Sequence, residues 1–455
     1  MFKRVLIANR GEVAVRVARA CRELAISPVC AVSEADLGAG WLGHMDEVVC
    51  IGPAPARESY LQRERVLQAA LQTHCSAVHP GWGFLAEDAL FAALCEQHGV
   101  SFVGPSAALI ARMGRKAPAR RAMEEAGLPV IPGSRDVAAG VDEALEAARA
   151  CGWPVILKAD AGGGGRGMRR CADEAELRRA FGEAAAEAAA AFGSPALYVE
   201  RFVEGGRHVE VQVLGDRFGS AVHLYERECS VQRNHQKLLE ESPSPALTQE
   251  ERERLGERAA AAARALGYAG AGTLEFLRAP SGELFFMEMN ARLQVEHAVT
   301  EMTTGIDIVT AQLRIAANQR LGLRQEDIRP RGHAIECRIN AEDPEHGFRP
   351  SPGTLEVFEV PAELGPGELR IDTHMGAGDE IGPHYDSLVA KVIAHAPTRS
   401  EAIETLRRTL SAARIEGVKT TLPLHLAVLE SAEFAAGRYD TRSIPGWRAA
   451  TAARG

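Results

Sequence analysis

Polar and apolar side chains alternate along the stretch Glu288-Met289-Asn290-Ala291-Arg292-Leu293-Gln294-Val295-Glu296. Alternate side chains of a β-strand lie on one face, so a strand here would present five polar groups together: those of Glu288, Asn290, Arg292, Gln294 and Glu296. An ordinary half-buried strand carries an arbitrary polar set on its solvated face, commonly threonine, lysine or serine. Two carboxylates, two amides and an arginine on one face therefore favour a functional site.

The segment just before this stretch is predicted to form a β-hairpin. Two apolar runs, 274–277 and 284–288, flank the turn-forming residues Ala279-Pro280-Ser281-Gly282-Glu283. If Ser281 and Gly282 form a two-residue turn, Glu275 lies directly opposite Glu288, with Cβ atoms about 4.5–5.5 Å apart, and the two charges destabilise the sheet. A bridging cation removes this conflict, and a few oxygen ligands that leave room for phosphate suit Mg²⁺. A raised carboxyl pKa without a metal is the weaker alternative.

A glycine-rich loop follows a predicted strand over 154–158 and reads Lys158-Ala159-Asp160-Ala161-Gly162-Gly163-Gly164-Gly165-Arg166-Gly167-Met168. Glycines let backbone N–H groups approach an anion closely. The GxxxxGK[ST] pattern of a P-loop is absent, and a run of glycines alone is as typical of a flexible loop. The lysine before the loop and the arginine within it favour a mobile lid over nucleotide phosphates.

Two further stretches alternate in the same way. Arg233, His235 and Lys237 would give one strand a basic face suited to an anionic substrate, although a solvated surface strand explains this segment equally well. In the stretch 333–340, Arg338 taken alone is more typical of an ordinary ion pair than of a catalytic residue.

Short apolar runs alternate with helical patterns over roughly the first 100 residues, which predicts a parallel α/β sheet. Strands are expected at 5–8, 77–79 and 100–103, and a helix at 13–24. The loop Asn9-Arg10-Gly11-Glu12 lacks the GxGxxG fingerprint, so a nicotinamide site is not indicated. Further helices are expected at 116–126, at 401–413 and, opened by a capping box of Thr248 and Glu251, up to about Leu266.

Composition excludes several classes of protein. The chain has 455 residues and a net charge of −9, which argues against sequence-independent binding of nucleic acid. Its nine cysteines form no CxxC pair, so reduced thiols in a cytoplasmic protein are expected rather than disulfides or a zinc site. No apolar run approaches the ~18 residues of a membrane span, and the apolar run at the N-terminus is too short for a signal peptide.

Read together, these segments resemble the biotin carboxylase family within the ATP-grasp superfamily. The resemblance covers nearly the whole chain, from 7–12 and 79–85 through the glycine loop, 207–210 and 288–297, to 336–343 and 385–387. It implies a fold of α/β and α+β type in three domains. These are a Rossmann-like (pre-ATP-grasp) N-terminal domain over 1–114, a central ATP-grasp domain over 115–330 with a mobile glycine-rich lid at about 131–203, and a mixed α+β C-terminal domain over 331–455.

Such enzymes phosphorylate bicarbonate with ATP, and the resulting carboxyphosphate supplies the carboxyl group for N1′ of biotin. The resemblance implies an ATP site made of Lys116, Lys158, Gly164, Gly165, Arg166, Gly167, Met168, Glu200, Arg201, Val203, His208, Gln232 and His235. It implies Mg²⁺, with Mn²⁺ as a substitute, on Glu275, Glu288 and Asn290, in agreement with the hairpin argument. Two departures, Asp160 for a usual serine and Asn234 for a usual arginine, make the phosphate region less positive.

The resemblance also assigns the reacting groups. Bicarbonate is expected on Arg292, Gln294, Glu296 and the backbone of Val295, with Glu296 as the general base. Lys237 would stabilise charge on the transferring phosphoryl group. The predicted catalytic residues are thus Glu296, Arg338, Lys237 and Arg292. Arg338 would stabilise the ureido oxygen of biotin, with Trp82 as a second biotin contact. A base beside an arginine and a metal stays ionised at neutral pH, as accepting a proton requires.

Biotin is expected to arrive on a separate biotin carboxyl carrier protein, with carboxyltransferase subunits as further partners, because neither region follows in this sequence. The alternative left open is that the chain is a fragment of a longer protein. A homodimer is expected, and neither nucleic acid nor a membrane is. The final acceptor of the carboxyl group is left open among acetyl-CoA, propionyl-CoA, a branched acyl-CoA, pyruvate and urea. Two rival functions are another ATP-grasp carboxylate–amine ligase and a non-catalytic nucleotide-binding subunit.

Overall fold

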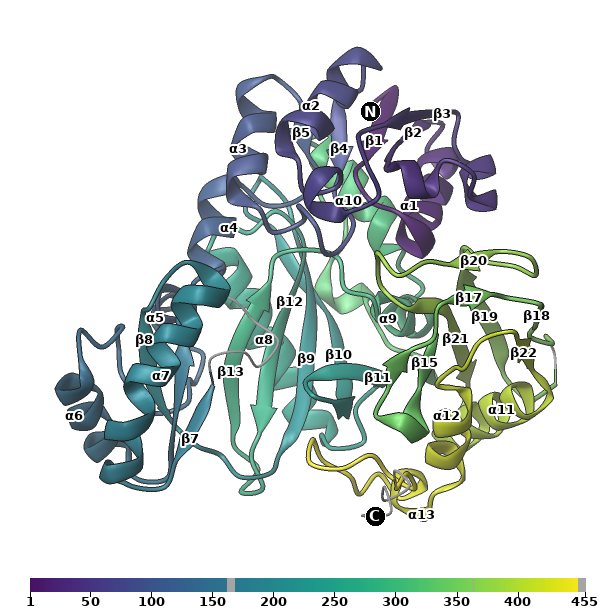
Figure 1. The fold of residues 1–455 in the computed structure, drawn as a ribbon. Coiled ribbons are helices and arrows are strands. Elements are labelled where there is room, and N and C mark those ends of the chain that lie inside the picture. Colours follow the sequence, from purple (N-terminus) through teal and green to yellow (C-terminus); the bar gives the residue numbers. More distant parts are fainter. Residues whose placement is uncertain (162–167, 363, 449–455) are drawn as a thin grey trace.

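The N-terminal part of the chain forms a parallel sheet with strand order β3-β2-β1-β4-β5. The protein is described by a computed structural model over residues 1–161, 168–362 and 364–448. The strands are β1 (Arg4–Ile7), β2 (Ser27–Val32), β3 (Glu47–Cys50), β4 (Ala77–His79) and β5 (Ser101–Phe102). Helices α1 (Gly11–Glu23), α2 (Arg63–Gln72), α3 (Ala89–Gln97) and α4 (Ala107–Met113) connect or follow them (Figure 1). The predicted alternation of strands and helices is confirmed.

The strand order reverses between β1 and β4, so the loops at the carboxyl ends of these two strands diverge and leave a crevice. The Asn9 side chain fastens one loop to the other, because its Nδ2 donates to the carbonyl oxygens of Pro80 (2.7 Å) and Trp82 (2.7 Å). Trp82 lines a cavity at this point together with Asn9, Arg10, Glu12 and Tyr385. The edge of the N-terminal sheet at the carboxyl ends of its strands therefore faces the C-terminal part of the chain, which contributes Tyr385 to the cavity.

An eight-stranded antiparallel sheet forms the centre of the molecule, in the order β13-β12-β9-β10-β11-β14-β21-β19 (Figure 1). Five of its strands precede residue 300: β9 (Arg207–Gly215), β10 (Ala221–Arg233), β11 (Gln236–Ser242), β12 (Gly270–Arg278) and β13 (Leu284–Asn290). The other three are β14 (His333–Asn340), β19 (Glu368–Thr373) and β21 (Leu388–Ala396). The sheet is thus continuous across the predicted domain boundary at 330/331.

Helices pack around this sheet. They are α5 (Lys116–Glu125), α8 (Gln249–Ala265), α9 (His297–Thr304), α10 (Ile308–Ala316), α11 (Arg399–Ala412), α12 (Leu422–Glu430) and α13 (Ala432–Ala435). The capping box predicted for α8 is present, since Thr248 Oγ1 accepts from the Glu251 N–H (3.2 Å) and the Glu251 carboxylate accepts from the Thr248 N–H (2.9 Å). Short strand pairs complete the C-terminal part: β15 (Glu342–Asp343) with β16 (Arg349–Pro350), β17 (Gly353–Thr354) with β20 (Glu380–Ile381), and β18 (Val357–Glu359) with β22 (Arg414–Glu416).

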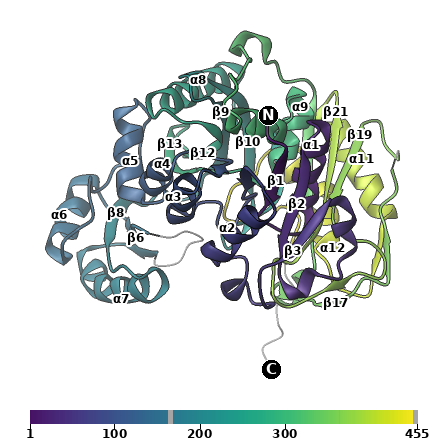
Figure 2. The same ribbon diagram turned by 90° about the horizontal axis from the view of Figure 1, so that it is seen from above.

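A small α/β unit projects from one side of the molecule, as Figure 2 shows. Its sheet has the order β7-β6-β8, from β6 (Val155–Ala159), β7 (Arg169–Cys171) and β8 (Leu197–Arg201). Helices α6 (Val141–Cys151) and α7 (Glu174–Phe192) pack on it around a separate apolar core. This unit lies within the predicted lid at 131–203, whose mobility stays a prediction. No helix in the described part of the chain has the length and apolar character needed to cross a lipid bilayer.

Glu241 on β11 is a buried carboxylate on which β11, β14, α11 and the segment after α13 meet. It accepts hydrogen bonds from His333 (2.6 Å), Arg399 (2.6 and 2.9 Å) and the Tyr439 hydroxyl. Burial alone would raise the pKa of Glu241, but the bonds from His333 and Arg399 outweigh it and lower the pKa to about 2. Since this is below the ordinary value of 4.5, the stabilisation is complete above that pH and is lost as pH falls towards about 2.

We therefore expect Glu241→Gln to lower the free energy of unfolding at pH 7 by about 3–5 kcal/mol, as removal of one partner from a buried ion pair does. The difference from the wild type should shrink as pH falls below about 4.5. Urea denaturation at pH 7 and at a pH near 3.5 measures it. As a control, Glu404→Gln should change stability little, because the ion pairs of Glu404 with Arg407 and Arg408 are largely solvated. A pH-independent difference for Glu241→Gln contradicts the prediction.

Candidate active site

The hairpin of β12 and β13 places Glu275 directly opposite Glu288, as predicted. The predicted two-residue turn is wrong, however. The Ala279 N–H donates to the Glu283 carbonyl (2.8 Å), so the loop is one residue longer and comprises Pro280 to Gly282. A bulge restores the register, because Phe276 pairs with Phe286 whereas Glu275 pairs with Glu288. The opposition of the two carboxylates thus results from two compensating irregularities.

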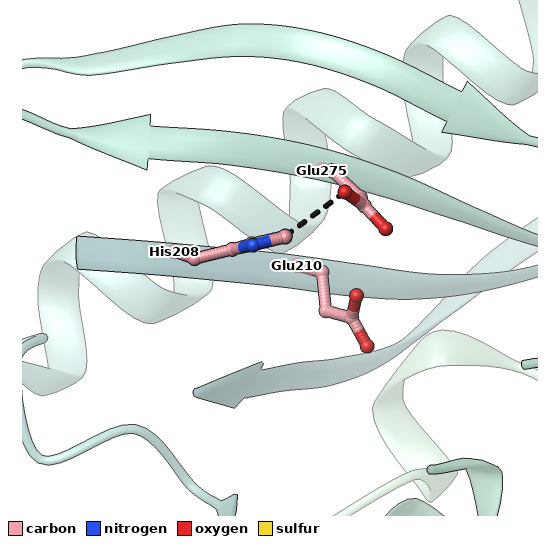
Figure 3. Close-up of side chains that lie close together, drawn as sticks. All are labelled: His208, Glu210 and Glu275. Atoms are coloured by element: carbon pink, nitrogen blue, oxygen red, sulfur yellow. Dashed lines mark ion pairs between the residues drawn. The ribbon is translucent and has the colours of Figure 1, made fainter. Parts of the chain in front are cut away.

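Cationic and amide donors surround Glu275 in the structure. Its carboxylate accepts from Lys237 Nζ (3.0 Å) and Asn290 Nδ2 (2.8 Å), and it forms an ion pair with His208, whose Nε2 lies 2.9 Å away. Glu275 is only 5% exposed, yet the charges of Lys237 and His208 outweigh burial and lower its pKa. His208, Glu210 and Glu275 also offer ligand atoms close enough together to hold a cation (Figure 3). Glu288, across the ladder, is paired with Lys116 Nζ (3.1 Å).

The predicted single strand over 288–296 is wrong beyond Asn290. Strand β13 ends there, residues 291–296 form an irregular loop, and α9 begins at His297. The polar side chains nevertheless come together, because Arg292 donates to Asn290 Oδ1 (2.9 Å) and to Gln294 Oε1 (3.1 Å). Gln294 Nε2 in turn donates to Glu275 (3.2 Å). Hydrogen bonds along the loop therefore gather the polar groups that a pleated strand was expected to align.

Glu87 is a residue of this site that the sequence interpretation missed. It lies just before α3, and its carboxylate accepts from Arg292 Nε (2.9 Å) and from the Ala291 backbone N–H (2.8 Å). The N-terminal part of the chain thus fixes both the direction of Arg292 and the start of the loop. Since the contact spans more than two hundred residues of sequence, no local pattern could have indicated it.

The predicted basic strand face at 233–237 is also wrong. The segment is a hairpin: β10 ends at Arg233, β11 begins at Gln236, and Asn234 and His235 form the turn with φ of 50° and 64°. Asparagine tolerates this left-handed conformation better than most residues, which accounts for Asn234. His235 is exposed at the turn, while Lys237 points into the protein.

Lys237 joins three buried carboxylates. Its ammonium donates to Glu210 (2.6 Å), Glu296 (2.7 Å) and Glu275 (3.0 Å), which uses all three N–H groups. Burial would lower the pKa of Lys237, but the three negative charges outweigh it and raise the pKa well above its usual range. Lys237 is therefore a fixed positive charge at the centre of the site.

Glu296 is fully buried between two cations. Its Oε1 accepts from Lys237 and its Oε2 accepts from Arg338 Nη2 (2.8 Å). Burial would raise the pKa of Glu296, but Lys237, Arg338 and Arg227 together hold it well below its usual range. Arg338 is itself shared with Glu240 on β11. The predicted base and the predicted biotin contact are thus in direct contact, and the base is ionised.

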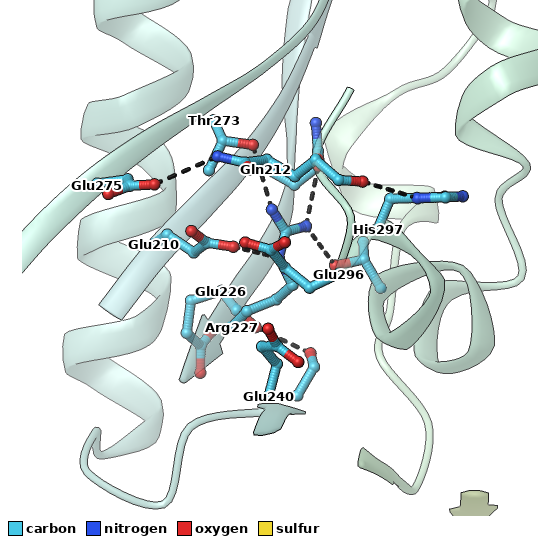
Figure 4. Close-up of polar contacts among 12 residues, drawn as sticks. Glu210, Gln212, Glu226, Arg227, Glu240, Thr273, Glu275, Glu296 and His297 are labelled. Carbon is cyan, nitrogen blue, oxygen red and sulfur yellow. Dashed lines mark hydrogen bonds and ion pairs between the residues drawn. The ribbon is translucent and has the colours of Figure 1, made fainter. Parts of the chain in front are cut away.

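A buried polar layer supports these residues (Figure 4). At its centre the Arg227 guanidinium donates to Glu210 (2.5 Å), Gln212 (2.9 Å), Thr273 (3.1 Å) and Thr300 (3.0 Å). These partners come from β9, β12 and α9, so one side chain fastens three elements behind the site. The sequence interpretation quoted Glu210 but gave it no role, although its alternation with His208 on one strand was a usable signal.

The predicted nucleotide residues form a second group of ion pairs. Lys158 Nζ lies 2.5 Å from a carboxylate oxygen of Glu200, whose other oxygen is paired with Arg120. Burial would raise the pKa of Glu200, but Lys158 and Arg120 outweigh it and lower the pKa. Asp160 accepts from the Ala117 N–H (2.8 Å) and from Arg115 Nε (2.9 Å), so its charge is used at the N-terminus of α5.

The remaining predicted contacts differ in their surroundings. Val203 packs in a small apolar cluster with Ile131, Ala279 and Phe285, and Arg201 lies over the Phe285 ring. Gln232 is buried beside Lys237 in the ladder of β10 and β11. Met168 is half-buried just after the glycine loop. The predicted lid residues Gly164, Gly165, Arg166 and Gly167 lie outside the described residues.

The two predicted biotin contacts come from different parts of the fold. Trp82 lines the cavity at the switch point of the N-terminal sheet, whereas Arg338, on the central sheet, is not among the residues that line it. Glu12 and His374 also line this cavity, and the Arg10 guanidinium lies over the ring of Tyr385, another lining residue. The role of Trp82 stays a prediction.

Comparison with known proteins supplies the family. Three family models match in succession: "Biotin carboxylase, N-terminal domain" over residues 1–110, "Carbamoyl-phosphate synthase L chain, ATP binding domain" over 115–324, and "Biotin carboxylase C-terminal domain" over 336–445. The chain is 50% identical over 445 residues to "Biotin carboxylase 1" of Bacillus subtilis, a match that covers 98% of each chain. The chain belongs to the biotin carboxylase family. The resemblance of the motifs is thereby confirmed.

Solved structures of biotin carboxylases agree with the three-part architecture. The biotin carboxylase domain dimer of the 2-oxoglutarate carboxylase of Hydrogenobacter thermophilus, in complex with MgADP, ADP and bicarbonate, is 48% identical, with a TM-score of 0.93 and 97% of each chain covered. The biotin carboxylase of Campylobacter jejuni, in a β-γ-ATP complex, is 44% identical, with a TM-score of 0.93 over 97% of this chain and 98% of that one. The predicted fold class of this biotin carboxylase is confirmed.

Proposed function

We propose that this biotin carboxylase carboxylates N1′ of biotin with ATP and bicarbonate, and that the loop 291–296 is where bicarbonate reacts. One observation carries the proposal: a fully buried, ionised Glu296 lies between Lys237 and Arg338, beside the opposed carboxylates of Glu275 and Glu288. A carboxylate–amine ligase needs the nucleotide and metal residues, but it does not need this combination of base and cations.

Glu296 is the general base in this proposal. Bicarbonate binds to Arg292, Gln294 and the backbone N–H of Val295, and Glu296 accepts its proton. The oxygen freed of its proton then attacks the γ-phosphorus of ATP, the bond to the β-phosphate oxygen breaks, and ADP and carboxyphosphate form. Because its pKa is low, Glu296 is deprotonated at neutral pH. The same low pKa makes proton transfer from bicarbonate to Glu296 less favourable.

Phosphoryl transfer is mostly a matter of positioning and charge neutralisation. Lys237 faces the end of the nucleotide that reacts. Lys116, Lys158 and His208 bind the phosphates. To do so, they leave the carboxylates with which they are paired in the structure, which are those of Glu288, Glu200 and Glu275 respectively. Glu275, Glu288 and the Asn290 side-chain oxygen are suited to hold Mg²⁺, because all are oxygen ligands on adjoining strands. When bound, the metal would neutralise negative charge on the phosphates.

Arg338 serves the second step. The C–O bond of carboxyphosphate breaks to give CO₂ and phosphate, the phosphate accepts the N1′ proton of biotin, and N1′ forms the new bond to CO₂. Negative charge develops on the ureido oxygen as the proton leaves. The Arg338 guanidinium stabilises that charge as a positioned donor. Its present partners, Glu240 and Glu296, hold it at the edge of the loop where bicarbonate reacts.

Release of ADP in the presence of Mg²⁺ tests this function, with and without bicarbonate and with and without free biotin. We expect turnover that requires bicarbonate and increases with biotin. Turnover indifferent to both would refute the proposed function, and binding of ATP with no turnover at all would favour the non-catalytic alternative.

Glu288→Gln tests the metal assignment. We expect the Mg²⁺ concentration for half-maximal ADP release to rise about tenfold or more, because a neutral amide is a poorer ligand for a hard cation. Titration of Mg²⁺ at fixed ATP measures this. Glu87→Gln is the control, because Glu87 contacts Arg292 and Ala291 but belongs to no predicted ligand set. Equal shifts in both variants would contradict the assignment.

We also propose the partners and the location. The "2-oxoglutarate carboxylase small subunit" of Hydrogenobacter thermophilus, 48% identical over 98% of this chain, is a subunit of a larger carboxylase. By analogy, biotin reaches this chain on a biotin carboxyl carrier protein, and carboxyltransferase subunits use the product. The dimer in the related structure supports a homodimer. A cytoplasmic location suits the reduced thiols of all the described cysteines.

A further inference from the structure

Lys391 is a fully buried lysine on β21 that the proposed reaction does not use. It is the direct neighbour of Arg338 in the ladder with β14 and of Asp372 in the ladder with β19, so all three side chains lie on one face of the sheet. This face is the one that packs against the loop 291–296. The position of Lys391 is therefore next to the site rather than in a remote part of the core.

The Lys391 ammonium holds the loop by its backbone. Its Nζ donates to the Val295 carbonyl oxygen (3.0 Å) and lies 2.8 Å from Glu12 Oε1 and 3.5 Å from Asp372 Oδ2. Burial would lower the pKa of Lys391, but Glu12, Glu336 and Asp372 outweigh it and raise the pKa, so the group is charged. The ammonium therefore donates a hydrogen bond to the peptide just before Glu296 and lies within ion-pair distance of two carboxylates.

A second buried donor fixes the preceding peptide. His297 Nδ1 lies 2.8 Å from the Gln294 carbonyl oxygen, and since a carbonyl can only accept, this nitrogen carries the proton. A trans peptide is planar, with its C=O and N–H pointing in opposite directions. Holding the carbonyls of Gln294 and Val295 therefore sets the direction of the Val295 N–H and of the Glu296 N–H, and with the latter the start of the Glu296 side chain.

Glu12 connects this anchor to the N-terminal part of the chain. It is the second residue of α1 and is 4% exposed, and of its two carboxylate oxygens Oε1 faces Lys391. Asp372 is held in place by Arg370 (2.7 Å), and Arg370 also binds Glu301 of α9 (2.7 Å). Four elements of the fold, α1, α9, β19 and β21, thus converge behind the loop.

We propose that Lys391 is a positioning residue for bicarbonate, which sets the loop 291–296 by holding the Val295 carbonyl and is itself held by Glu12 and Asp372. This inference rests on the proposed function. It predicts that loss of this anchor disturbs the bicarbonate site. The nucleotide site should stay intact, because Lys391 does not connect the nucleotide residues on α5, β6 and β8 to the loop backbone.

The test compares Lys391→Met, which keeps the length of the side chain without its charge, with Glu12→Gln and with the control Arg399→Met. Arg399 forms an ion pair with the fully buried Glu241 in the same part of the chain but away from the loop. We expect Lys391→Met to raise the KM for bicarbonate about tenfold or more, and to leave the Kd for MgATP within about twofold of the wild-type value. Thermal unfolding of each variant reports stability separately.

A purely structural role for Lys391 would lower stability without changing the KM for bicarbonate. We expect this pattern for the control Arg399→Met, which should lower the Tm and leave the KM for bicarbonate unchanged. A bicarbonate KM for Lys391→Met within about twofold of wild type overturns the inference, as does an equal loss of bicarbonate and nucleotide affinity. If Lys391→Met does not fold, Glu12→Gln decides, with a rise in the bicarbonate KM supporting the inference and an unchanged KM overturning it. Wild-type turnover without bicarbonate dependence would instead overturn the proposed function, and this inference with it.

Discussion

Replacing Glu296 by glutamine is expected to lower kcat for bicarbonate-dependent ADP release by about a thousandfold, within the range for loss of a general base. The amide has nearly the shape of the carboxylate but cannot accept a proton from bicarbonate. Binding of MgATP should survive, because Glu296 contacts Lys237 and Arg338 and none of the residues around Glu200. Steady-state kinetics together with a nucleotide-binding titration separate the two effects.

Glu240 supplies a matched control. It is as fully buried as Glu296 and binds the same Arg338 guanidinium, but it lies on β11 rather than on the loop 291–296. Burial, helped by the charge of Glu296 and opposed by Arg338, raises its pKa to about 7, so glutamine imitates a form that Glu240 already adopts near neutral pH. Glu240→Gln should therefore lower kcat by less than about tenfold. Equal losses in the two variants would argue against Glu296 as the base.

The second large effect is expected for Lys237→Met, with a fall in kcat of about a hundredfold to a thousandfold. The substitution removes the charge that we propose faces the transferring phosphoryl group. It also leaves Glu210, Glu275 and Glu296 close together without their shared ammonium. Buried like charges at such distances raise one another's pKa, so Glu296 will be partly protonated at neutral pH.

The pH profile distinguishes this explanation from a loss of folding. In the wild type the pKa of Glu296 lies well below its usual range, so activity above pH 6 does not depend on its titration. In Lys237→Met the residual activity should rise between about pH 6 and pH 9 as Glu296 loses its proton. Lys237→Arg retains the charge and should keep the flat profile even if kcat falls. A flat profile for Lys237→Met would show that Lys237 does not control the base.

Local patterns were sufficient to predict several of the elements. Periodicity and turn residues predicted β1, α1, β4 and α8, because each is specified by its own apolar pattern and capping residues. The pairing of Glu275 with Glu288 was also predicted correctly, but for an incomplete reason. A longer loop and the bulge before Glu288 cancel each other, and neither is visible in the sequence, since packing of Phe285 and Phe286 determines the register near the turn.

The proximity of these polar residues was predicted better than their conformation. The alternation over 288–296 indicated which side chains lie close together, although Arg292, Gln294 and Glu296 lie on a loop. A strand and a hydrogen-bonded loop can both gather alternate side chains, and the sequence alone does not distinguish them. For Arg233 and Lys237 the same reasoning failed, because the two-residue turn at Asn234 and His235 reverses the chain between them.

Residues that act through long-range contacts were missed. Glu12, Glu87 and Lys391 come from parts of the chain far from the loop that they fix. Only Lys391 had a local signal, as a single charge within the apolar run of β21, and that signal indicates burial without naming a partner. The supporting layer of an active site depends on topology, and topology is the part of a fold that local patterns specify least.

The pairing of β11 with β14 limits how this enzyme can be recombined with its relatives. A crossover placed between α10 and β14, at the sequence boundary suggested by the family models, would join two halves that share one continuous ladder. In a chimaera, β11 from one parent must match β14 from the other in every cross-strand pair, including Glu240 with Glu336. Separated halves would each expose a long unpaired strand, which is a template for aggregation. A segment exchanged between relatives must therefore take β11 and β14 from the same parent.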